Sequence, residues 1–92
     1  MALLTNGVSG SVSVGTGSTQ ILLADGGRQY ALIVNDSDTK MYLSIGSAAV
    51  TGKGIPLLAN GGAIEITPDN LMVGTVFAIC SAPGKSISYF YV

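Results

Sequence analysis

Short runs of apolar residues alternate with polar residues along this chain, and small clusters of Gly, Pro, Asn and Asp separate the runs. The clearest case is the stretch 28–46 (RQYALIVNDSDTKMYLSIG), where two apolar runs flank the polar residues 35–39. Two strand-like runs joined by such a short polar segment predict a β-hairpin. Both faces of the first run are apolar, which predicts a strand in the centre of a sheet.

The same pattern recurs over the rest of the chain and predicts a fold built from strands alone. Further strands are expected at 11–15, 19–24, 55–59, 63–67, 74–81 and 86–92, with turn signals about every 8–12 residues. The run 74–81 should be a second central strand. Pro56 has no amide N–H for a sheet ladder, so its strand should lie at an edge.

These patterns predict an all-β fold, and no segment carries a helical period over helical length. We expect a small antiparallel β-sandwich or barrel, jelly-roll-like, of about seven or eight short strands. Residues 11–92 should form this single domain, and residues 1–10 should precede it as an N-terminal arm.

Composition indicates that such a small domain needs a partner. A chain of 92 residues buries only about 60–65% of its unfolded surface. One cysteine excludes an internal disulfide, and the lack of histidine argues against a zinc site. Only 10% of the residues are charged and mean hydropathy is +0.55, so much of the surface is uncharged. We therefore expect a homo-oligomer, with a trimer favoured.

The charge balance and hydropathy pattern also narrow the classes of partner. A net charge of −1 and a pI near 4.8 argue against nucleic acid, which attracts strongly basic surfaces. No apolar stretch approaches the roughly 18 residues of a membrane-spanning helix, and the start of the chain has no signal-peptide pattern. We expect neither a nucleic-acid nor a membrane partner.

The candidate catalytic and metal-binding motifs fail on residue type or spacing. Asp36 and Asp38 do not fit a calcium loop, because Lys40 occupies the third ligand position, and an exposed turn would not separate their pKa values for acid–base catalysis. The Gly84-Lys85-Ser86 segment precedes a strand, not the helix of a phosphate-binding loop. Cys80 lies in an apolar run and should be a buried small hydrophobe. We predict no enzyme activity, cofactor or metal.

Aromatic residues concentrate in the last predicted strand, where Tyr89 and Tyr91 share one face and Phe90 takes the other. The tyrosines have three interpretations: core packing, a subunit interface, or stacking on sugar rings. The candidate subunit or capsid interface comprises these two tyrosines with three further residues. These are Leu3, Leu4 and Tyr42.

Several stretches resemble a group of small virion proteins of tailed bacteriophages. The resemblance rests on 13–24 (SVGTGSTQILLA), 27–37 (GRQYALIVNDS), 42–46 (YLSIG), 54–57 (GIPL), 60–62 (NGG) and 74–79 (GTVFAI), and spans roughly residues 11–92. It implies a β-sandwich that decorates or cements a capsid, or a fibre-associated or head-fibre base domain. It transfers no catalytic residues.

Together these observations predict a non-enzymatic virion structural protein, assembled in the host cytoplasm. The favoured role is a capsid decoration or cement protein that stabilises the head through contacts with copies of itself and with the major capsid protein. The alternative is a host-binding or carbohydrate-binding module of a tail fibre or head fibre.

Overall fold

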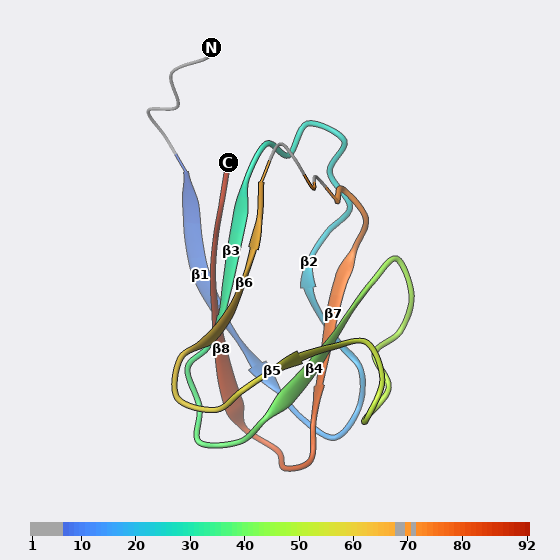
Figure 1. Cartoon of the computed structure of the whole chain (residues 1–92), viewed down its shortest axis with the longest axis vertical. Helices are drawn as coiled ribbons and strands as arrows, with labels where there is room; N and C mark the ends of the chain where they lie inside the picture. Colours follow the sequence, from blue (N-terminus) through green and yellow to red (C-terminus); the bar gives the residue numbers. More distant parts are fainter. Residues whose placement is uncertain (1–6, 68–69, 71) are drawn as a thin grey trace.

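Eight strands form the framework of the computed structural model, which describes residues 7–67, 70 and 72–92. They are β1 (Val8–Val14), β2 (Thr19–Leu22), β3 (Ala31–Asn35), β4 (Met41–Ile45), β5 (Ile55–Leu57), β6 (Gly62–Ile66), β7 (Val76–Cys80) and β8 (Lys85–Tyr91). Two four-stranded antiparallel sheets pack face to face as a sandwich (Figure 1). The predicted all-β fold is confirmed, and the described residues contain no α-helix.

The strand order is that of a jelly roll. The first sheet has the order β1-β8-β3-β6 and the second has the order β2-β7-β4-β5. Among these strands, β4 and β5 are the one consecutive pair within a single sheet, and every other connection crosses between the sheets. Such a double-sheet, eight-strand arrangement defines the jelly roll.

The predicted hairpin at 28–46 is wrong, although both of its strands exist. β3 pairs with β6 and β8 in the first sheet, whereas β4 pairs with β5 and β7 in the second. The intervening residues 36–40 therefore carry the chain across the sandwich. The alternation of apolar residues predicts a strand but not its partner, because the partner is chosen by packing between distant segments.

Strand positions within the sheets agree with the sequence in three cases. β3 and β7 both lie inside their sheets, and β5, which contains Pro56, lies at an edge. β1 begins at Val8, so the last residues of the predicted arm belong to the first sheet, where Val8 pairs with Tyr91. Leu3 and Leu4 lie outside the described residues.

Inward-pointing residues of the two sheets meet in one apolar core. The largest are Val14, Ile33, Ile66 and Ile87 from the first sheet and Met41, Leu43, Leu57 and Val76 from the second. Each is at most 2% exposed, and burial of such a side chain contributes about 1.5–3 kcal/mol. Cys80 is also buried there, as the sequence predicts.

The outer face of the second sheet is covered in part by the loop 46–54. Ala49 in this loop is buried, and its amide N–H donates to Ser18 Oγ at 2.8 Å. Figure 1 shows the loop on the side of the second sheet that faces away from the first. Gly54 (φ 89°) is required there, because a Cβ would collide with the Leu43 carbonyl oxygen. Ile79 on this outer face is accordingly only 9% exposed.

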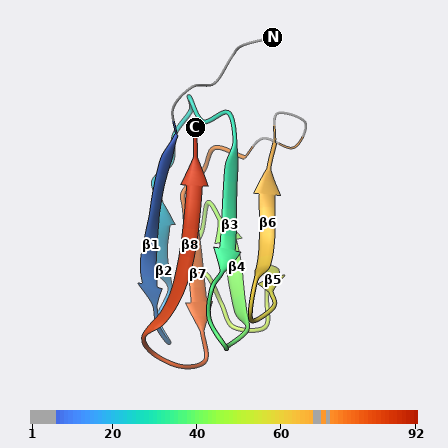
Figure 2. The same cartoon turned by 90° about the vertical axis from the view of Figure 1, so that its left-hand side faces the viewer.

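Among the described residues, no loop covers the outer face of the first sheet (Figure 2). Strand alternation places serines of β1 and β8 on this face, with Phe90 beside them and Leu32 and Val34 on β3. Glu65 on β6 is the charged residue of this face, and its carboxylate accepts a hydrogen bond from the Tyr30 hydroxyl at 2.7 Å. The described part of this face is therefore open and almost uncharged.

Candidate functional site

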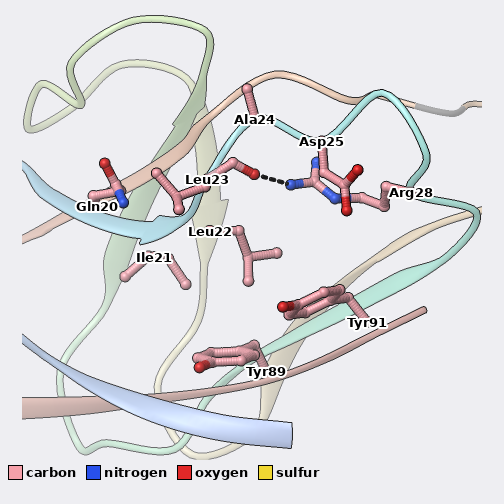
Figure 3. A pocket seen from close by; sticks show the side chains of 9 residues that line it. All are labelled: Gln20, Ile21, Leu22, Leu23, Ala24, Asp25, Arg28, Tyr89 and Tyr91. Atoms are coloured by element: carbon pink, nitrogen blue, oxygen red, sulfur yellow. Dashed lines mark hydrogen bonds between the residues drawn. The ribbon is translucent and has the colours of Figure 1, made fainter. Parts of the chain in front are cut away.

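A cleft of about 400 Å³ opens between the two sheets, where β2 faces β8 (Figure 3). One wall consists of residues 20–25, which belong to β2 and the segment that follows it. Tyr89 and Tyr91 form the opposite wall, and Arg28 closes one end. The volume lies within the range of small-molecule sites in proteins.

The two tyrosines lie at alternate positions of β8, so both point to the inner side of the first sheet. Their ring centroids are 6.1 Å apart with an interplanar angle of 32°. Figure 3 shows the rings along the cleft, with Leu22 on the other side of it. Gly10 stands opposite Tyr89, and a Cβ at this position would clash with the Tyr89 hydroxyl. The glycine thus makes room for the ring at the sandwich edge.

Arg28 is buried at the end of the cleft, with only 2% of its surface exposed. Its Nη1 donates to the carbonyl oxygens of Met72 (2.8 Å) and Gly74 (3.2 Å), and its Nη2 donates to that of Leu23 (2.7 Å). Its Nε has no hydrogen-bond partner. The guanidinium therefore ties the segment after β2 to the segment before β7 and leaves its Nε–H without a partner.

The remaining polar groups of the cleft are uncharged, apart from one carboxylate. Asp25 Oδ1 accepts the amide N–H of Gly27 at 2.9 Å, which fixes the turn before Arg28. Gln20 is exposed at the rim, and the hydroxyls of the two tyrosines add donors and acceptors. Aromatic rings beside hydrogen-bonding groups are a lining that suits a polyhydroxylated ligand such as a sugar.

The predicted interface residues do not come together in the described structure. Tyr42 lies on the outer face of the second sheet, level with Pro56 and Ile79, and the Lys40 ammonium is 5.1 Å from its ring centroid. Tyr89 and Tyr91, by contrast, point inward from the first sheet. Their partly buried positions combine core packing with a wall of the cleft.

The acidic residues of the 35–39 turn, Asp36 and Asp38, are both exposed. Asp38 Oδ1 forms an ion pair with Lys85 Nζ at 2.7 Å, and the hydrogen bond from Lys85 lowers the pKa of Asp38. Within the ranges that the structure describes, no group of three or more His, Cys, Asp or Glu residues could hold a metal ion. Cys80 Sγ is buried and contacts the Lys40 carbonyl oxygen at 3.7 Å.

Sequence reasoning missed the two buried polar residues, Arg28 and Asn35. Asn35 is fully buried, and its side chain holds the crossing between β3 and β4. One signal was available for Arg28, which is the sole arginine of a chain poor in charge and directly precedes a strand. Nothing in the local pattern distinguishes Asn35 from an ordinary turn residue.

Searches against protein-family models, curated proteins and solved structures found no match for the chain. Among the described residues, no helix has the length and apolar character needed to cross a membrane.

Proposed function

We propose that this chain is a virion structural protein, a capsid decoration protein that stabilises the head through contacts with copies of itself and with the major capsid protein. The outer face of the first sheet carries the proposal. Its exposed Phe90, half-buried Leu32 and Val34, and serine-lined flank form a nearly uncharged surface that no other segment in the described part covers. An uncharged surface with exposed apolar groups is typical of protein–protein contacts.

The fold is compatible with this role but does not decide it. Jelly rolls form viral capsid proteins and lectins alike, and a fold alone does not assign a function. The low charge of the chain and the resemblance to bacteriophage virion proteins favour the capsid. A trimer remains our expectation for the oligomer, and the virion, assembled in the host cytoplasm, for its location.

The test measures binding to heads assembled without this chain. We expect the purified chain to co-sediment with such heads and to raise their temperature of disruption. Phe90→Lys should weaken binding at least tenfold, because it places a charge beside Leu32 on the open face. Val50→Lys is the matched control, since Val50 is exposed on the loop 46–54. Failure of the wild-type chain to bind heads would refute the capsid role.

A second candidate is a host-binding module of a tail fibre or head fibre that recognises carbohydrate. The observation that favours it is the cleft, where two tyrosine rings face a rim of polar groups. Binding to a glycan array followed by titration calorimetry tests it. Tyr91→Ala should abolish binding, whereas Tyr42→Ala, on the outer face of the other sheet, should not. An array without a hit would exclude this candidate.

A further inference from the structure

The four sheet edges of the sandwich differ in how well they resist pairing with another chain. β5 is three residues long and contains Pro56, and β2 is four residues long with a bulge between Gln20 and Leu22. β6 carries Glu65, which is exposed. Short strands, proline, bulges and charges are the features by which proteins protect sheet edges.

β1 has none of these features. It is seven residues long, its sequence VSGSVSV contains no charge and no proline, and its pairing with β8 has no register shift. Figure 2 shows it as the outermost strand of the first sheet. Within the described part of the chain, one side of its backbone therefore presents unpaired N–H and C=O groups along a long edge, which is a template for another strand.

The side chains of β1 also match a second copy of β1. Two copies related by a two-fold axis perpendicular to the sheet pair antiparallel, with inner faces on the same side. The register that pairs all seven residues has its axis at Ser11. On the inner face it sets Val8 opposite Val14 and Gly10 opposite Val12 of the second copy, and on the outer face serines meet serines.

Pairing would also cover apolar surface that the single chain leaves open. Val8 is 47% exposed although it lies on the inner face of the sheet. A hollow of about 230 Å³ adjoins it, lined by Gly7, Val8, Tyr91 and Val92. In this register Gly15 of the second copy would lie opposite Gly7, at the border of the hollow.

We propose that two copies of this chain associate through β1, which joins their first sheets into one continuous eight-stranded sheet. The inference rests on the self-association in the proposed function and specifies its contact. A two-fold contact gives assemblies with an even number of copies. Trimers held by another surface would therefore be joined into hexamers.

Cysteine cross-linking of the full-length chain tests both the contact and its register. Residues directly opposite in an antiparallel pair have Cα atoms about 4.5–5.5 Å apart, which a disulfide spans. Ser11→Cys should form a disulfide-linked dimer in a glutathione redox buffer. Ser9→Cys, on the same face, is the control, because its copies would be about 13 Å apart along the strand direction. The native Cys80 is buried and should not interfere.

Light scattering with a charge variant gives the second measurement. Val8→Lys should weaken association at least tenfold, since its ammonium is solvated in the single chain but faces a valine in the pair. Leu58→Lys, at another exposed aliphatic residue, should leave association unchanged. A monomer at high concentration, a trimer without further association, or equal cross-linking of both cysteine variants would overturn the pairing. Binding to heads could persist in each case, so these results are distinct from a failure of the capsid role.

Discussion

Two polar side chains are buried at opposite ends of β3, and they are satisfied in different ways. Asn35 is the last residue of β3, at the crossing to β4, and its amide donates to the carbonyl oxygens of Thr39 (2.8 Å) and Leu57 (3.0 Å). Its Oδ1 accepts the amide N–H and the hydroxyl of Ser37 at 3.1 and 2.7 Å. Arg28 precedes the strand and bonds three carbonyl oxygens, but its Nε has no partner and a cleft adjoins it.

The difference shows where the sandwich is closed and where it is open. At the Asn35 end every donor and acceptor of a neutral side chain is used, so the two sheets are joined without a gap. At the Arg28 end one long, positively charged side chain bridges the segment after β2 and the segment before β7. A cleft adjoins this bridge. We infer that the Asn35 end sets the stability of the fold, whereas the Arg28 end leaves room for a ligand.

Asn35→Ala should be the most destabilising of the substitutions considered at these two ends. It removes four hydrogen bonds and takes the amide donor from the buried Leu57 carbonyl oxygen, which together cost about 3–5 kcal/mol. Urea denaturation followed by circular dichroism measures the free energy of unfolding. Ser37→Ala is the companion variant, and its loss should be only about 1 kcal/mol because fewer bonds are removed. Equal losses for both variants would show that Asn35 does not act as the central residue of this crossing.

Arg28→Met should cost less, about 1–3 kcal/mol. Methionine preserves much of the buried aliphatic volume, and water from the cleft can hydrate the carbonyl oxygens that lose their donor. Arg28→Lys keeps the charge but cannot reach three carbonyl oxygens with the same geometry. The same denaturation experiment compares both variants with Asn35→Ala. A larger loss for Arg28→Met than for Asn35→Ala would reverse the comparison.

The Asn35 and Arg28 ends of β3 also show which features of the structure the sequence predicts and which it does not. Alternation of apolar residues was sufficient for the strands and the all-β class, because each strand has one face in the core. It failed at residues 35–39. Local composition predicts a hairpin tip there, but the chain crosses to the other sheet, and the buried Asn35 side chain stabilises this crossing. The cleft was not predictable either, since it depends on the distance between β2 and β8, which are far apart in sequence.

Stability should also depend on pH at both ends of β3, but in opposite pH ranges. At the Asn35 end we expect a dependence on acidic pH. The hydrogen bond from Lys85 lowers the pKa of Asp38 below its usual value. The ionised form is therefore favoured in the folded state, and this contribution is present above the unfolded pKa and lost as pH falls through the folded pKa. Asp38→Asn should remove this part of the acid dependence of the melting temperature. The effect is small because the pair is exposed. An unchanged acid profile in the variant would contradict it.

At the Arg28 end we expect stability to depend on alkaline pH. This dependence should be the smallest of the predicted effects. Tyr30 follows Arg28 closely in sequence, and the hydrogen bond from its hydroxyl to Glu65 raises the pKa of Tyr30 above 10.0. The neutral phenol is favoured in the folded state, so the stabilisation is complete below the unfolded pKa and is lost as pH rises through the folded pKa. Tyr30→Phe keeps the edge contact with Phe90 but removes the hydroxyl. We expect a spectrophotometric titration to lose its highest-pH tyrosine transition in this variant, and the melting temperature to fall less steeply above pH 10. If Asp38→Asn and Tyr30→Phe altered the melting temperature in the same pH range, the pH responses of the two ends would not be independent.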